Sequence, residues 1–290
     1  MRVPCAVTVL DPRMVGVLSD SNFAVPFSDG RWLEGPAYSA QGRYLLFSDI
    51  PNDRTLRLDE MSGKVAVFDS PSRFANGRTF DRNGRAVTCL HGDRAVVRRE
   101  HDGTETLIAA EYAGRRLNSP NDVVVDSRGD IWFTDPTYGI VSDYEGHAAE
   151  PEQPVRGLYR WHDADGTLEL VTGDFDQPNG LAFTPDESSL YVVDSGRGSI
   201  TELPLTGDRV PRVVVAGDYR FDGIRVDPEG RIWAATVRGV SCFDADGVEM
   251  LQIAVPERVS NLTFGGRQGN VLYLTATTSL YAVRTSITGR

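Results

Sequence analysis

The sequence predicts an all-β fold, a six-bladed β-propeller, and three observations support that prediction. Six copies of a similar segment follow one another at intervals of 39 to 58 residues, which brackets the roughly 40 to 50 residues of a four-stranded blade. Each copy contains short runs rich in aromatic and branched residues, the composition of strands. Helical periodicity is nearly absent, with one weak helix candidate at residues 106–112. We therefore expect a single domain over residues 1–290, with a metal site at its centre.

Each copy opens on an acidic or amide side chain that stands just before an apolar run. The six opening residues are Glu34, Asn76, Asn121, Asn179, Asp222 and Asn261. A turn rich in Asp, Asn and Gly follows the run, as at Asp126-Ser127-Arg128-Gly129, and the next strand comes directly after it. These residue types supply the backbone geometry of hairpin turns. The repeat therefore predicts antiparallel hairpins joined in series.

The two ends of the chain must close the ring, because an unpaired strand edge would otherwise be exposed. We expect a strand at residues 6–10 to lie beside residues 279–283, so that the N-terminal strand completes the last blade. The longest interval between copies contains a polar insertion at residues 138–157. Its composition predicts a surface loop, which we place as a flap over one face of the propeller.

Composition and charge exclude several function classes. The chain has 30 Lys and Arg against 41 Asp and Glu, a formal net charge of -11, which repels phosphate backbones and argues against nucleic acid or an anionic membrane as a partner. Cys5, Cys89 and Cys242 are widely spaced, so neither a disulfide framework nor a structural zinc site is expected. No run approaches the ~18 apolar residues of a membrane span. We expect a cytoplasmic protein, and the sequence does not indicate its oligomeric state.

The six opening side chains should converge, because the innermost strand of each blade runs beside the central axis of a propeller. They comprise two carboxylates and four amides, with no basic residue expected opposite them. A hard cation would compensate such partly desolvated charge. The all-oxygen set favours Ca²⁺, with Mg²⁺, Mn²⁺ or Zn²⁺ as alternatives. The competing interpretation is that these residues only cap turns through local hydrogen bonds.

At these residues the chain resembles the sugar-lactonase family of calcium-dependent six-bladed propellers, which includes gluconolactonase and regucalcin (senescence marker protein). The resemblance spans nearly the whole chain, from Trp32-Leu33-Glu34-Gly35-Pro36, through Asn118-Ser119-Pro120-Asn121-Asp122 and Gln177-Pro178-Asn179-Gly180-Leu181, to Ser260-Asn261-Leu262. It implies a metal-dependent hydrolase that opens sugar-acid lactones, a class of small-molecule substrate.

The resemblance also implies roles for individual residues. Glu34, Asn179 and Asp222 are implied to bind the metal, and Asn121 to lie beside it and contact metal, water or substrate. Asp222 is further implied to be the general base or the nucleophile, so the metal set is Glu34, Asn121, Asn179 and Asp222. Regucalcin-type members carry an Arg where this chain has Ser119, so their contact with the sugar lactone does not transfer. Tyr138 is our candidate for a substitute substrate contact, together with Asn121.

Other readings of the chemistry remain open. The chain has no GxSxG motif, and Ser195 has no evident His partner, which argues against a serine hydrolase. One alternative is an organophosphate or aryl-ester hydrolase of the diisopropyl fluorophosphatase type, and another is a non-catalytic calcium-binding propeller. His91 is expected to be a solvated or hydrogen-bonded loop residue. Three aspartates that recur at strand ends are expected to accept backbone N–H groups: Asp49, Asp135 and Asp194.

Overall fold

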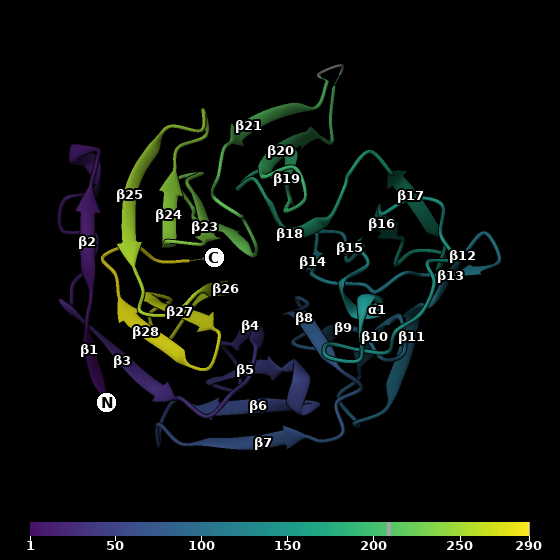
Figure 1. Ribbon diagram of the computed structural model, residues 1–290, viewed down its shortest axis with the longest axis horizontal. Coiled ribbons are helices and arrows are strands. Elements are labelled where there is room, and N and C mark those ends of the chain that lie inside the picture. Colours follow the sequence, from purple (N-terminus) through teal and green to yellow (C-terminus); the bar gives the residue numbers. More distant parts are fainter. Residues whose placement is uncertain (208–209, 290) are drawn as a thin grey trace.

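Six antiparallel sheets surround a central axis in the computed structural model, which describes residues 1–207 and 210–289 (Figure 1). The prediction of an all-β six-bladed propeller is confirmed. In every sheet the first strand of the repeat lies innermost, and its successors follow outward in chain order. Within these described ranges, no helix is long and apolar enough to cross a membrane.

The first three blades have four strands each. Blade 1 contains β4 (Leu33–Ser39), β5 (Tyr44–Asp49), β6 (Arg54–Asp59) and β7 (Val65–Asp69); blade 2 contains β8 (Ala75–Phe80), β9 (Ala86–Leu90), β10 (Ala95–Arg99) and β11 (Glu105–Ala109); blade 3 contains β14 (Val123–Val125), β15 (Ile131–Asp135), β16 (Gly157–Trp161) and β17 (Leu168–Thr172). The hairpin of β12 (Glu111–Tyr112) and β13 (Arg115–Arg116) connects blades 2 and 3.

The last three blades complete the ring. Blade 4 contains β18 (Pro178–Phe183), β19 (Ser189–Asp194), β20 (Ser199–Pro204) and β21 (Arg212–Ala216); blade 5 contains β22 (Ile224–Val226), β23 (Ile232–Thr236), β24 (Gly239–Phe243), β25 (Glu249–Ala254) and the N-terminal β2 (Ala6–Val9); blade 6 contains β26 (Val259–Gly265), β27 (Val271–Ala276), β28 (Leu280–Arg284), β3 (Asn22–Phe27) and β1 (Arg2–Pro4). Among the described residues, three single turns of helix lie between strands: η1 (Pro12–Met14), η2 (Ile50–Asn52) and α1 (Tyr138–Val141).

The N-terminal strands are woven into two blades, not one. The expected pairing of residues 6–10 with residues 279–283 is wrong, because β2 pairs with β25 of blade 5 and the neighbour of β28 is β3 (Figure 1). Side-chain burial explains the difference. All four residues of β2 are exposed, whereas Phe23 of β3 is fully buried and packs edge-on against Tyr281 of β28, with ring centroids 5.5 Å apart. β3 therefore takes the position next to β28, because its Phe23 side chain can be buried there.

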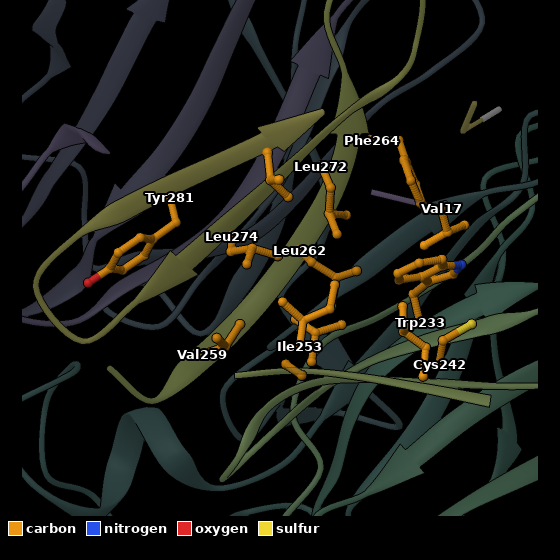
Figure 2. Packing of buried hydrophobic residues seen from close by; sticks show 14 of the residues in the cluster. Val17, Trp233, Cys242, Ile253, Val259, Leu262, Phe264, Leu272, Leu274 and Tyr281 are labelled. Atoms are coloured by element: carbon orange, nitrogen blue, oxygen red, sulfur yellow. The ribbon is translucent and has the colours of Figure 1, made fainter. Parts of the chain in front are cut away.

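The hydrophobic core lies between neighbouring blades. Figure 2 shows the contact of blades 5 and 6, where Trp233 and Cys242 face Leu262, Leu272 and Leu274. All five side chains are fully buried. Burying one such apolar side chain contributes about 1.5–3 kcal/mol relative to leaving it in water, so the stacked blades stabilise one another.

The helix candidate at residues 106–112 is wrong. Glu105–Ala109 forms β11 and pairs with β10, and residues 111–112 belong to a hairpin. Leu107 is 62% exposed while the adjacent Ile108 is buried, which is the alternation of a strand at a sheet edge. Pairing with β10 therefore decides the conformation of this segment.

The inner strands approach one another so closely at the axis that glycine is required there. A Cβ added at Gly77 would lie 2.3 Å from the backbone oxygen of Asn121, and one at Gly180 would lie 2.6 Å from that of Asp222. The Gly77 N–H donates to that Asn121 oxygen at 2.8 Å. The opening residues therefore do not sit at turn tips. Four lie inside inner strands at irregularities of the ladder, and Asn121 and Asp222 lie two residues before β14 and β22.

Candidate active site

One pocket of about 370 Å³ opens at the end of the axis where the inner strands begin. It is lined by Trp32, Glu34, Asn76, Asn121, Tyr138, Tyr144, Glu145, Asn179, Ser195, Asp222 and Arg258. We call it the axial pocket. Five of the six opening residues and Tyr138 thus meet in one volume, as the propeller geometry requires.

Asn261 is the opening residue that does not line the axial pocket. Its Oδ1 accepts the Leu262 N–H at 2.8 Å, and its Nδ2 lies 3.5 Å from the carboxylate of Asp122. That carboxylate also pairs with Arg225 at 3.5 Å. Asn261 therefore lies in a polar cluster with Asp122 and Arg225 next to the axial pocket, and it is only 2% exposed.

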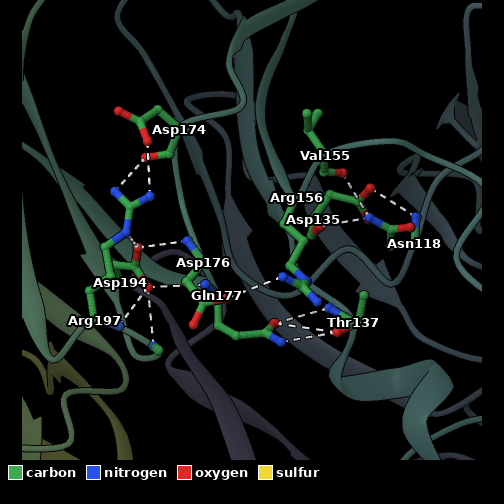
Figure 3. A network of polar contacts seen from close by, with 11 residues as sticks. Asn118, Asp135, Thr137, Val155, Arg156, Asp174, Asp176, Gln177, Asp194 and Arg197 are labelled. Carbon is green, nitrogen blue, oxygen red and sulfur yellow. Dashed lines mark hydrogen bonds and ion pairs between the residues drawn. The ribbon is translucent and has the colours of Figure 1, made fainter.

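Aspartates at strand ends fix the segments that carry three of the pocket residues. Asp49, Asp135 and Asp194 end the second strand of their blades. They accept the backbone N–H groups of Arg31, Asn118 and Asp176 at 3.0, 2.8 and 2.8 Å. Each donor stands three residues before Glu34, Asn121 or Asn179. Figure 3 shows this arrangement at Asp135 and Asp194. The prediction that these carboxylates accept backbone N–H groups is confirmed.

The axial pocket concentrates acidic groups in a desolvated space. Burial, together with repulsion from Asp222, raises the pKa of the Glu34 carboxyl well above its ordinary value. Burial also raises the pKa of Asp222 to about 7, and the Glu145 carboxyl adds to that rise. Burial raises the pKa of Glu145 itself to about 7. Each of these acids would hold its charge more readily beside a cation.

Arg258 corrects the expectation that no basic residue stands opposite the ring. Its Nη2 lies 3.8 Å from Oδ2 of Asp222, and its guanidinium covers the Trp32 ring at 5.3 Å from the centroid. It opposes the effect of burial by lowering the pKa of Asp222. Arg258 lies outside the repeated motif, three residues before Asn261, in the segment that enters the last inner strand. Arg31, Asn118 and Asp176 also stand three residues before an opening residue, and this common spacing was the sequence signal that could have pointed to Arg258.

The insertion covers part of the axial pocket and is tied to the ring by His91. The Nδ1 of His91 is 2.9 Å from the backbone oxygen of Glu145, and its Nε2 is 3.1 Å from Nδ2 of Asn76. The neutral imidazole therefore donates through Nδ1 to the backbone oxygen of Glu145 in the insertion and accepts through Nε2 from the side chain of Asn76. His91 is fully buried, so it is a hydrogen-bonded and not a solvated residue, and burial lowers its pKa to about 4.

Tyr138 begins α1 at the start of the insertion, and the preceding Thr137 is hydrogen-bonded to Gln177, which stands just before the first strand of blade 4. The Thr137 N–H donates to Oε1 of Gln177 at 3.2 Å, and Nε2 of Gln177 donates to the Thr137 hydroxyl at 3.0 Å (Figure 3). Burial raises the pKa of Tyr138 to about 12, so its phenol stays a hydrogen-bond donor at neutral pH. Glu145 and Tyr144, on the same insertion, also line the pocket, although composition indicated only a polar loop.

Ser195 lies in the pocket but is engaged as a structural hydroxyl. Its Oγ donates to the backbone oxygen of Phe221 at 2.6 Å and accepts from Nδ2 of Asn179 at 3.1 Å. No histidine lines the axial pocket in the described part of the chain. The geometry agrees with the prediction against a serine hydrolase, and it orients the Asn179 amide so that its oxygen remains available.

The donor set fits a hard divalent ion. Glu34, Asn121, Asn179 and Asp222 contribute two carboxylates and two amides to one pocket, and all are at most 7% exposed. Among the described residues the Asn121 side chain makes no hydrogen bond, and no three His, Cys, Asp or Glu side chains cluster closely enough to hold a metal. An ion here would therefore need the amide oxygens as well as the carboxylates, which is the chemistry of calcium and magnesium sites.

Comparison with known proteins identifies the family. The model of the SMP-30/Gluconolactonase/LRE-like region matches residues 32–278. The chain belongs to this family. It is 29% identical to the gluconolactonase of Zymomonas mobilis, over 98% of this chain and 87% of that protein. It is 26% identical to the 6-deoxy-6-sulfogluconolactonase of Pseudomonas putida, over 84% and 82% of the two chains.

Solved structures of the SMP-30/gluconolactonase family share the architecture. The gluconolactonase of Xanthomonas campestris superposes with a TM-score of 0.92 at 35% sequence identity, covering 98% of this chain and 97% of the other. The family resemblance that the sequence indicated over nearly the whole chain is thereby confirmed as membership.

Proposed function

We propose that this protein is a divalent-metal-dependent hydrolase that opens sugar-acid lactones. One observation carries the proposal: four oxygen-bearing side chains from four different blades, Glu34, Asn121, Asn179 and Asp222, line a single pocket. Family relatives named as lactonases act on small sugar lactones, which supports a substrate of that class.

The four side chains would hold the ion, and Ca²⁺ is the first choice because all donors are hard oxygens. When bound, a divalent cation supplies a Lewis acid that polarises the lactone carbonyl. Glu34, Asn121 and Asn179 keep the donor geometry rigid, since the segments before them are fixed by the strand-end aspartates.

Asp222 acts as the general base in this proposal. Its carboxylate accepts a proton from water as the water oxygen adds to the carbonyl carbon. The ring C–O ester bond then breaks, Asp222 returns that proton to the leaving oxygen as a hydroxyl, and the new carboxylic acid releases its own proton to solvent as it becomes a carboxylate. A carboxylate base is needed even with a calcium ion present, because that ion acidifies bound water only weakly. The rival mechanism is direct attack of Asp222 on the carbonyl. Asn121 and Tyr138 are the proposed substrate contacts, because both reach the pocket beside Asp222.

The experiment is a pH-stat assay on glucono-1,5-lactone with purified protein. Turnover should disappear with EDTA and return with Ca²⁺ or another divalent ion. Glu34→Gln should lose metal and turnover together, whereas Glu229→Gln, at an exposed residue outside the pocket lining, should keep both. Metal binding without turnover on any lactone would favour a calcium-binding propeller. Turnover only on diisopropyl fluorophosphate or an aryl ester would favour the other hydrolase class.

A further inference from the structure

A second depression, of about 420 Å³, adjoins the axial pocket. It shares Tyr138, Ser195 and Arg258 with that pocket, and beyond them it is walled by Arg197, Arg220 and Asp218, together with Phe221 and three glycines. We call it the arginine groove. Because the two hollows share three lining residues, one ligand can extend from the axial pocket into the groove.

The arginine groove is basic in a protein that is otherwise acidic. Three Arg and one Asp line it, although the whole chain carries 41 acidic against 30 basic residues. The single acid, Asp218, is 97% exposed and lies 4.0 Å from the Arg220 guanidinium. An exposed pair of that kind neutralises little of the arginine charge.

Two of the three arginines have hydrogen-bonding capacity to spare. Arg197 is engaged by Asp174 at 2.9 Å and Asp194 at 3.4 Å. In the part of the chain that the structure describes, the side chains of Arg220 and Arg258 make no hydrogen bond, and Arg258 reaches Asp222 only at 3.8 Å. A guanidinium presents a planar set of donors that matches a carboxylate, phosphate or sulfonate.

The acids of the axial pocket disfavour such an anion placed directly beside them. Glu34, Asp222 and Glu145 would repel a second negative group placed among them. An anionic substituent would therefore lie on the side where Arg258 and Arg220 stand. The charge pattern separates the two hollows into a reaction site and an anion site.

We propose that the arginine groove binds an anionic substituent of the substrate, a phosphate, sulfonate or carboxylate remote from the lactone bond, and so selects charged over neutral sugar lactones. The inference rests on the proposed lactone hydrolysis and names the substrate class within it. Arg220 is the specificity-determining residue, and Arg258 bridges the groove and the axial pocket.

The test compares kcat/KM for 6-phosphoglucono-1,5-lactone and glucono-1,5-lactone. The wild-type ratio should exceed about tenfold, the effect of charge-assisted hydrogen bonds to one anion. Arg220→Gln should lower this ratio about fivefold, and added salt should lower the wild-type ratio as well. The matched control is Arg82→Gln, because Arg82 is 71% exposed like Arg220 but lines a different depression; it should leave the ratio unchanged.

A wild-type ratio near one, or a ratio that Arg220→Gln does not change, would overturn the proposal. If neither lactone is opened, the proposed function fails. Calorimetric titration with 6-phosphogluconate and gluconate then tests anion binding in the arginine groove independently of turnover. Tighter binding of the phosphorylated acid that Arg220→Gln weakens would support the anion site. Equal binding of the two acids, or none, would refute it.

Discussion

Nη2 of Arg258 lies 3.8 Å from Oδ2 of Asp222, across the junction between blades 6 and 5. The arginine favours the charged carboxylate, while burial and Glu145 favour the protonated form. The proposed base is therefore held between two opposing influences that come from different parts of the chain. Its charge state depends on the relative position of neighbouring blades and of the insertion.

Replacing Asp222 by Asn should remove the base with little change of shape. We expect kcat on glucono-1,5-lactone to fall about 10²- to 10⁴-fold, the usual contribution of general base catalysis. Metal analysis should accompany the pH-stat assay, and Asp165→Asn, in an exposed turn, is the control. Full turnover by an Asp222→Asn protein that still holds metal would show that another group is the base.

Asp135 makes stability depend on pH. Burial raises its pKa from 3.8 to about 7, so the folded state binds a proton that the unfolded state has released between those values. The stability from this group is present below about pH 4 and is lost as the pH rises to about 7. Asp135→Asn should therefore gain stability relative to wild type across that window, by up to about 4 kcal/mol. Urea unfolding at a series of pH values measures the difference, and parallel profiles would contradict it.

His91 should hold the insertion in place. His91→Ala removes the contacts to the Glu145 backbone and to Asn76, so we expect faster hydrogen exchange and proteolysis in residues 142–156. The strands of blade 3 should remain protected. His101→Ala, in an exposed turn, should match wild type. Unchanged exchange of the insertion in His91→Ala would mean that other contacts position it.

Gly77 should not tolerate a side chain. Gly77→Ala places a Cβ 2.3 Å from the Asn121 oxygen, and we expect a loss of about 1–3 kcal/mol in the free energy of unfolding, typical of overpacking. Gly63→Asn is the control, since a Cβ there meets nothing within 4 Å and Asn accepts the positive φ of 67°. Chemical denaturation compares the two. Equal stability of both variants would refute the close approach of the inner strands.

The repeat made the fold and the centre of the site predictable. A side chain that recurs once per blade, such as Glu34 or Asn179, must reach the axis in any propeller, so its position follows from topology. The spacing alone could not tell which N-terminal segment closes the ring. That choice depends on how well Phe23 fills the space beside Tyr281, a packing relationship between residues far apart in the sequence.

The parts of the site that were missed lie outside the repeat. Glu145 lies on an insertion that the other blades lack, and the sequence signal for Arg258 was its position three residues before Asn261, outside the repeated motif. Glu145 reaches the pocket from the insertion, whose backbone is hydrogen-bonded to His91. Asn76 and Asn261 shared the same sequence signal, yet Asn76 lines the pocket and Asn261 pairs near Asp122.

The pairing of β3 with β28 also sets the order in which the molecule can be completed during synthesis. Because β3 precedes β28 in the chain, β3 is synthesised before Leu280–Arg284, and its aromatic side chain is covered only after that partner strand has been made. Blades 1 to 4 need no such partner and can fold as they appear. A nascent chain stopped before residue 280 would therefore carry several finished blades and an N-terminal strand exposed to chaperones and proteases.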